Sequence, residues 1–258
     1  MTPSGDALAR FGRTCFALAL IAFGAASFVV RDFVAGRAPA WPSSAGVVWA
    51  YFTGTLFVVA GLRIVLGRRP AFGAIAAAVL IFGWAFLRQL PVAFADQQLG
   101  GAWTSLGKAL ALSGGALGVA ASIIWSSASA STQELRHAAT MNLVGRCSLG
   151  AFLVLAGVQH FLFTPFVMTL VPTWIPGAMF WAYFAAVALL AGGVGLILPP
   201  TSRLAAALVG AMIFIWLLVL HIPRGVAMHN RNEWTAVIEA LAFSGIAFAL
   251  VARQSRSE

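Results

Sequence analysis

Three of the four histidines lie within residues 144–258, close to other polar residues. His160 and His221 each end a long apolar run, and Arg224 follows soon after His221. The next polar stretch reads MHNRNEW and begins at Met228. Ionisable side chains within apolar runs are costly, so they mark functional positions by default. The candidate catalytic residues are therefore His160, His221 and Glu233, and the candidate ligand-binding residues are Arg224, His229, Asn232, Trp174 and Trp234.

These residue types suit hydrogen bonding to a carbonyl group and proton transfer. A histidine at a helix end donates to a ligand carbonyl and passes protons to water, and Arg224 or Glu233 would complete the proton path. Trp174 or Trp234 would pack on the ligand ring. The alternative is structural: the histidines only hydrogen-bond neighbouring helix ends, and the tryptophans form an aromatic belt at the membrane interface.

Lys108 and Glu239 form a second candidate feature. Each lies five residues after a tryptophan, Trp103 or Trp234, in otherwise similar surroundings. Five residues correspond to about 7.5 Å of helix rise, which places both charges below the interface. Because an unpaired charge is expensive there, we expect an ion pair between them. In the alternative interpretation, Glu239 joins the histidines as a proton acceptor.

The composition places most of the chain in lipid. Of 258 residues, 61% are hydrophobic and only 9% are charged, whereas a soluble domain has roughly 25% charged residues. The net charge of +9 comes from basic residues scattered singly between apolar runs, as expected for side chains that hold helix ends at headgroups. No basic stripe suggests nucleic acid as a partner.

Eight stretches are long and apolar enough to cross a bilayer, which requires about 20 residues. Glycine and alanine within them allow close helix packing. Arg88 and Lys108, near the ends of such stretches, are expected to reach the interface. The predicted spans cover residues 11–30, 47–66, 71–90, 105–125, 144–163, 178–198, 203–221 and 235–252.

An internal repeat organises these spans. When Gly12-Arg13 is placed over Gly145-Arg146, the motif WAYF at 49–52 falls on WAYF at 181–184, after a gap of one residue. Further along, ALALSG at 109–114 falls on ALAFSG at 240–245. Ordered matches over such a length indicate duplication. The other matched pairs are Phe28 and Phe161, Pro39 and Pro172, Trp41 and Trp174, Gly61 and Gly193, Trp84 and Trp216, and Pro91 and Pro223.

The predicted fold is therefore an all-α integral membrane protein of eight transmembrane helices, in two parallel four-helix repeats. An even number of spans in each repeat places the pseudo-twofold axis along the membrane normal. The predicted units are residues 1–126, a cytoplasmic linker at 127–143, and residues 144–258. Because Ser27 replaces His160 and Gln89 replaces His221, we expect the second unit to carry the site and the first to serve as scaffold.

Basic residues in short loops set the orientation. Ten arginines fall on the side that carries both termini, and six basic residues fall on the other side. Both termini are therefore expected to be cytoplasmic in a multi-pass protein of the cell inner membrane. The candidate site then faces the outer leaflet.

The second half resembles the DoxX family of small four-helix membrane proteins. The resemblance rests on GVQHFLFTPFVMTLVPTWIPG, an apolar span, and HIPR at 221–224. It implies a membrane subunit of a quinone-linked oxidoreductase, with a redox-enzyme subunit as a partner. No set of catalytic residues is carried over from the family.

The leading functional hypothesis is a subunit that interacts with quinone at the outer leaflet. The alternatives are a non-catalytic membrane scaffold or assembly partner, and a small-solute transporter. Haem is not favoured because His160 and His221 stand without any other haem signal. Neither Cys15 nor Cys147 lies in a motif with metal-ligand spacing, so no metal site and no disulfide are expected.

Overall fold

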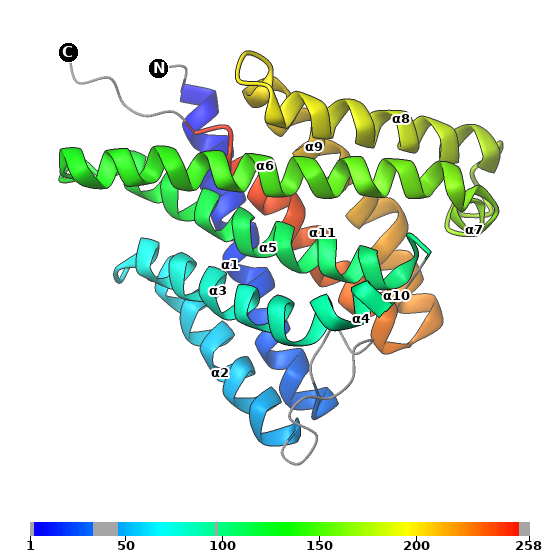
Figure 1. Ribbon diagram of the computed structural model, residues 1–258, viewed down its shortest axis with the longest axis horizontal. Helices are drawn as coiled ribbons and strands as arrows, with labels where there is room; N and C mark the ends of the chain where they lie inside the picture. Colours follow the sequence, from blue (N-terminus) through cyan, green and yellow to red (C-terminus); the bar gives the residue numbers. More distant parts are fainter. Residues whose placement is uncertain (1–2, 33–45, 96–97, 253–258) are drawn as a thin grey trace.

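The computed structural model describes residues 3–32, 46–95 and 98–252, and every regular element within them is a helix (Figure 1). Two of the elements, η1 and η2, are π-helices. In chain order the elements are α1 (Pro3–Val30), α2 (Gly46–Val65), α3 (Pro70–Trp84), η1 (Ala85–Gln89), α4 (Leu90–Ala95), α5 (Gly101–Trp125), α6 (Thr132–Leu162), α7 (Thr164–Met168), α8 (Ala178–Ile197), α9 (Ser202–Trp216), η2 (Leu217–His221), α10 (Ile222–Met228) and α11 (Arg231–Ala249).

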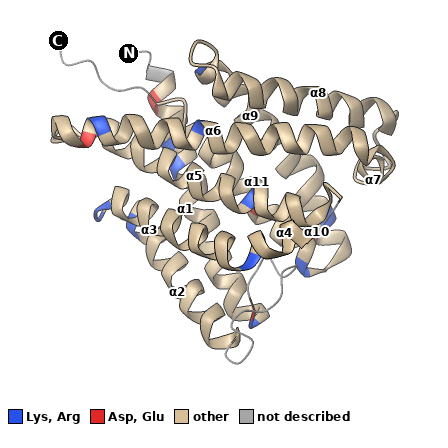
Figure 2. Cartoon of the chain, in the orientation of Figure 1, with Lys and Arg blue, Asp and Glu red and all other residues tan. Residues whose placement is uncertain are grey.

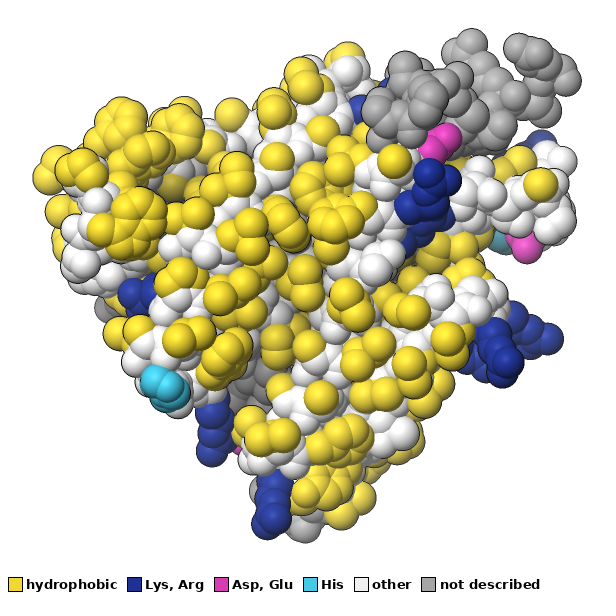
Figure 3. All heavy atoms as spheres, turned by 180° about the vertical axis from the view of Figure 1, so that it is seen from behind, with side chains coloured by type: hydrophobic (Ala, Val, Ile, Leu, Met, Phe, Trp, Pro, Cys, Tyr) yellow, Lys and Arg dark blue, Asp and Glu magenta, His cyan; other side chains and the backbone are white. Residues whose placement is uncertain are grey.

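Among the residues that the structure describes, seven helical stretches are long and apolar enough to cross a membrane. They are Gly5–Val30, Gly46–Val65, Pro70–Ala95, Gly101–Trp125, Thr132–Leu162, Ala178–Ile197 and Ser202–Met228. Apolar side chains dominate the face in Figure 3, and Phe72 and Val79 are 60% and 66% exposed. A soluble monomer rarely exposes so much apolar surface. The chain is therefore an all-helical, multi-pass membrane protein.

These seven stretches coincide with seven of the eight predicted spans. The eighth predicted span, 235–252, overlaps α11, which is a helix but is not among the seven. Its N-terminal half carries Arg231, Glu233 and Glu239, and these residues lower its mean hydropathy.

The core lies where α1, α5 and α11 meet in the middle of the bundle (Figure 1). Helix α1 packs on α2 and α11, and α6 packs on α5 and α8. Fully buried side chains such as Phe16, Val119 and Ile246 fill this region. Helix α5 is consequently far more buried than a helix surrounded by lipid.

Several helix crossings are close enough to require glycine. A Cβ atom on Gly12 of α1 would lie 2.5 Å from the carbonyl oxygen of Gly245 in α11. A Cβ atom on Gly145 of α6 would lie 2.9 Å from the Cα atom of Gly118 in α5. Small residues allow helices to approach this closely in membranes.

Helix α6 begins earlier than predicted, at Thr132 instead of residue 144, so much of the predicted 127–143 linker is helical. A capping box explains the start: the Glu134 amide donates to Ser131 Oγ, and the Ser131 amide donates to the Glu134 carboxylate at 2.7 Å. The segment 165–177, between the predicted spans 144–163 and 178–198, likewise includes most of the short helix α7 (Thr164–Met168). The matched residues Pro39 and Trp41 lie outside the described residues.

Candidate functional site

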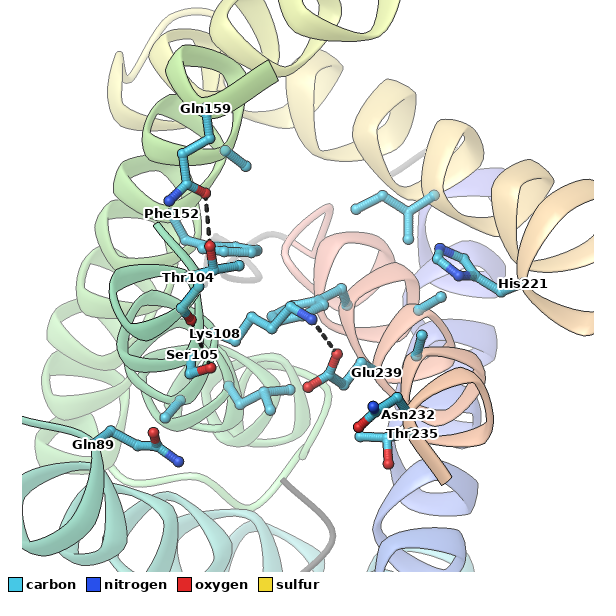
Figure 4. A pocket seen from close by; sticks show the side chains of 18 of the residues that line it. Gln89, Thr104, Ser105, Lys108, Phe152, Gln159, His221, Asn232, Thr235 and Glu239 are labelled. Carbon is cyan, nitrogen blue, oxygen red and sulfur yellow. Dashed lines mark hydrogen bonds and ion pairs between the residues drawn. The ribbon is translucent and has the colours of Figure 1, made fainter. Parts of the chain in front are cut away.

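A cavity of about 690 Å³ lies between the helices of the two halves (Figure 4). Such a volume is within the range of small-molecule sites, which are mostly apolar with a few polar groups. Aromatic side chains form much of its wall, and the rings of Phe152 and Phe243 stack with centroids 5.2 Å apart. The other aromatic residues lining the cavity are Phe23, Phe57, Trp84, Phe163, Phe166 and Trp216.

The expected contact between Lys108 and Glu239 is present. Lys108 Nζ on α5 lies 2.5 Å from Glu239 Oε2 on α11, and both residues line the cavity (Figure 4). Their side chains are 32% and 12% exposed. Each charge would be costly alone at this position, so each compensates the burial of the other.

A second ion pair joins Arg224 to Glu233. Arg224 Nη2 donates to Glu233 Oε1 at 2.9 Å, and its Nε donates to Oε2 at 3.2 Å, which gives the two-point geometry of a strong pair. The side chain of Asn230 caps α11 by accepting from the Glu233 amide. Arg224 Nη1 also donates to the carbonyl oxygen of Thr169 at 3.3 Å. The pair therefore connects α10, α11 and the segment after α7.

The two candidate histidines line the same cavity but differ in their contacts. His160 Nδ1 lies 2.7 Å from the carbonyl oxygen of Ala156 one turn earlier. Because that oxygen only accepts, a neutral His160 ring carries its proton on Nδ1 and leaves Nε2 as an acceptor. His221 ends η2, and its side chain makes no hydrogen bond to another described residue.

The π-helices place two polar side chains at the cavity. Helix η1 follows Trp84 and ends at Gln89, and η2 follows Trp216 and ends at His221. Each is followed two residues later by a proline, which has no N–H for the normal helical hydrogen bond. The amides of Leu90 and Ile222 instead reach back five residues. Single π-turns of this kind are frequent at functional sites.

The structure brings seven of the sequence-predicted site residues around the cavity: His160, His221, Arg224, Asn232, Glu233, Lys108 and Glu239. The other three lie outside it. Trp174 is 70% exposed, and His229 is exposed at the end of α10. Trp234 is 45% exposed and packs beside Gly225. For a ligand in this cavity, the expected ring contacts of Trp174 and Trp234 are replaced by Phe152, Phe243 and Trp216.

Residues of the first half also line the cavity, whereas the site was expected in the second half alone. Ser27 and Gln89, which the internal alignment treats as replacements of His160 and His221, both contribute to its wall. Arg88, expected to reach the interface, is only 4% exposed because the helix continues beyond it. The internal alignment could have indicated this, because it pairs Ser27 and Gln89 with two histidines that line the same cavity.

Two polar side chains on α5 and α6 complete the wall. Thr104 Oγ1 donates to Gln159 Oε1 at 2.9 Å, and Gln159 Nε2 donates to the carbonyl oxygen of Leu99 at 2.6 Å. Gln159 on α6 therefore hydrogen-bonds both Thr104, near the start of α5, and Leu99, just before that helix. Over residues 3–32, 46–95 and 98–252, no group of three or more His, Cys, Asp or Glu side chains is arranged to hold a metal ion.

Comparison with known families gives one match. Residues 149–252 match the model of a family described as a domain of unknown function, DUF8561. The match covers the C-terminal part of α6 and everything described after it, including η2 and α11. No curated protein and no solved structure matches the chain.

Proposed function

We propose that this protein binds a lipid-soluble quinone in the cavity between its halves, as a DoxX-like subunit of an oxidoreductase system. One observation carries the proposal: an aromatic-walled cavity inside an apolar bundle, with His221 and two ion pairs in its lining. A quinone dissolves in lipid and presents two carbonyl acceptors. The aromatic walls suit its ring, and the polar groups suit its carbonyls.

We further propose that the chain is a duplicated four-helix unit with eight crossings, the eighth being α11. In each half a π-helix follows an equivalent tryptophan and precedes an equivalent proline. The crossing of Gly12 with Gly245 corresponds by repeat to the contact of Gly145 with Gly114. Helix α11 packs against α1, α5 and α9, so it faces less lipid and tolerates two glutamates.

The proposed orientation places both termini in the cytoplasm, with the protein in the inner membrane. Arginines at the ends of α2, α3 and α9 support it, since basic residues are retained on the cytoplasmic side (Figure 2). Arg63, Arg68 and Arg69 lie together around the turn between α2 and α3. In this orientation the cavity opens toward the outer leaflet.

In this proposal the chain binds quinone and handles protons, and the electrons pass through a partner subunit. The His221 ring would donate a hydrogen bond to one carbonyl. Arg224 and Glu233 lie nearer the ends of their helices and are partly exposed, with side chains 22% and 18% accessible. They would connect His221 to water at the membrane surface.

Fluorescence quenching tests the proposal, because Trp84 and Trp216 line the cavity. The purified protein in nanodiscs is titrated with decylubiquinone. We expect saturable quenching, and about tenfold weaker binding in His221→Ala, which loses a hydrogen bond and its packing. His137→Ala is the matched control, since His137 is exposed at the other end of the molecule. Equal affinity in all three proteins, or no saturable quenching, contradicts the proposal.

A membrane scaffold is the second candidate function, favoured by a lipid-facing groove. The groove has a volume of about 740 Å³ and runs between α3, α5 and α6, with mainly apolar lining residues such as Phe82, Leu110 and Leu155. If the chain acts only as a scaffold, changing both His160 and His221 to alanine leaves partner binding and quinol turnover of the assembled system unchanged.

A further inference from the structure

The ring of His160 is held by its own helix through one of its two nitrogens. Nδ1 lies 2.7 Å from the carbonyl oxygen of Ala156, four residues earlier in α6. Because a carbonyl oxygen only accepts, this contact is a hydrogen bond only when Nδ1 carries a proton. Nδ1 adjoins the stem of the side chain, so the other nitrogen, Nε2, lies on the outer edge of the ring.

The surroundings of His160 favour a neutral ring, which decides what Nε2 can do. Within the described part of the chain no ion pair involves His160, and the two carboxylates at the cavity, Glu233 and Glu239, already belong to ion pairs. A second proton on the ring would add an unpaired charge inside an apolar bundle, which is costly. Nε2 therefore keeps its lone pair and acts as a hydrogen-bond acceptor.

Nε2 of His160 is also within reach of a bound molecule. His160 lines the cavity, and no described residue donates a hydrogen bond to its Nε2. Across the described residues, the side-chain nitrogen and oxygen atoms that are both fully buried and without a partner lie elsewhere, on Ser122, Trp125, Asn142 and Arg146. Nε2 thus lacks a partner without being shut off, so a donor on a ligand can reach it.

A fixed acceptor distinguishes the two oxidation states of a quinone. The oxidised form presents carbonyl oxygens, which only accept, so a carbonyl that faces Nε2 opposes one lone pair to another. The reduced form, a hydroquinone, presents hydroxyl groups, which donate and also accept. An amide, or the His221 ring, can turn either a donor or an acceptor toward a ligand, so such groups suit both states. His160 is the residue that separates them.

We propose that the cavity binds the reduced, hydroquinone form in preference to the quinone, with His160 Nε2 accepting a hydrogen bond from one hydroxyl group. This assignment rests on the proposed quinone function and deepens it by naming the oxidation state that the site selects. His160 is a specificity-determining residue, because the same ligand oxygen is attracted to Nε2 as a hydroxyl and repelled from it as a carbonyl. A hydroxyl oxygen still accepts, so the hydrogen bond proposed for His221 does not require the oxidised form.

The test compares three probes by isothermal calorimetry in nanodiscs under argon. The probes are decylubiquinol, decylubiquinone, and the dimethyl ether of decylubiquinol, which keeps the ring but has no hydroxyl donor. His160→Phe keeps a ring and removes the acceptor, whereas His160→Gln supplies a side-chain oxygen that can replace Nε2. His137→Phe is the matched control, because it makes the same change at an exposed position of α6.

We expect the natural protein to bind decylubiquinol about five- to tenfold more tightly than either of the other probes, as one additional hydrogen bond predicts. His160→Phe should bring the three affinities within about twofold of one another. His160→Gln and His137→Phe should keep the preference for decylubiquinol. If thermal unfolding shows that His160→Phe does not fold, the three affinities of the natural protein still decide the question.

The protonation of the ring is measured separately, by nitrogen NMR of protein with isotope-labelled histidine. The signals of His160 are those lost in His160→Gln. We expect a proton on Nδ1 and none on Nε2, and a shift of the Nε2 signal when decylubiquinol is added. A proton on Nε2 in the unliganded protein contradicts the acceptor role, whatever the probes do.

Failure of this assignment is distinguishable from failure of the quinone function. If decylubiquinone binds as tightly as decylubiquinol, or if His160→Phe keeps the preference, the acceptor role of His160 is wrong and the quinone function stands. If neither decylubiquinone nor decylubiquinol binds the natural protein, the quinone function fails, and the preference fails with it.

Discussion

The two ion pairs of the cavity hold different parts of the molecule together. Lys108 and Glu239 are 131 residues apart and join α5 to α11, whereas Arg224 and Glu233 are nine residues apart and join α10 to α11. The first pair has one N···O contact, while the second has two contacts and an additional bond to Thr169. The first pair therefore holds the two halves together, and the second shapes the rim of the site.

The largest effect is expected from breaking the inter-half pair. Lys108→Met leaves Glu239 unpaired within the bundle, and removal of one partner of a buried pair costs about 3–5 kcal/mol. The free energy of unfolding in detergent measures the loss. Adding Glu239→Met should restore most of the stability, because a buried pair replaced by apolar side chains is often neutral. If Lys108→Met alone costs less than about 1 kcal/mol, the pair does not secure the halves.

A smaller and more local effect is expected at the rim pair. Arg224→Leu removes the two hydrogen bonds that Arg224 donates to Glu233 and the one that it donates to the carbonyl oxygen of Thr169. We expect a loss of about 1–3 kcal/mol, with faster hydrogen exchange confined to α7, α10 and the start of α11. Arg231→Leu is the matched control, because Arg231 is exposed in the first turn of α11. Exchange that rises equally throughout the bundle would show that the rim pair is not local.

These pairs also show what could be predicted from the sequence. The Lys108–Glu239 contact could be predicted because the matched tryptophans indicate the depth of both residues, and because an unpaired charge is expensive at that depth. The long apolar runs predicted seven of the spans, because charged groups are expensive within lipid. The helical extension at 132–143 was missed because hydropathy measures lipid burial, and helix outside lipid is governed by caps such as Ser131 and Glu134.

The position of Gln89 in the cavity wall was missed for a different reason. A π-turn changes which side chains face inward, and hydropathy carries no information about such a change of register. Pro91 and Pro223 were visible as matched residues, but their effect on the preceding helical turn depends on neighbouring helices. The first half was consequently interpreted as scaffold, although the folded chain directs Ser27 and Gln89 to the shared cavity.

The smallest effect is expected at an aromatic residue outside both pairs. Trp174 is 70% exposed and does not line the cavity, so Trp174→Phe should leave quinone affinity within twofold and the unfolding free energy within about 0.5 kcal/mol. Trp216→Phe is the matched change inside the cavity, where the smaller ring removes wall contacts, and it should weaken binding several-fold when measured by isothermal calorimetry. Calorimetry is needed because both changes alter the fluorescence. If Trp174→Phe weakened binding more than Trp216→Phe, the ligand would bind at the membrane interface and not in the cavity. Neither ion pair would then border the ligand.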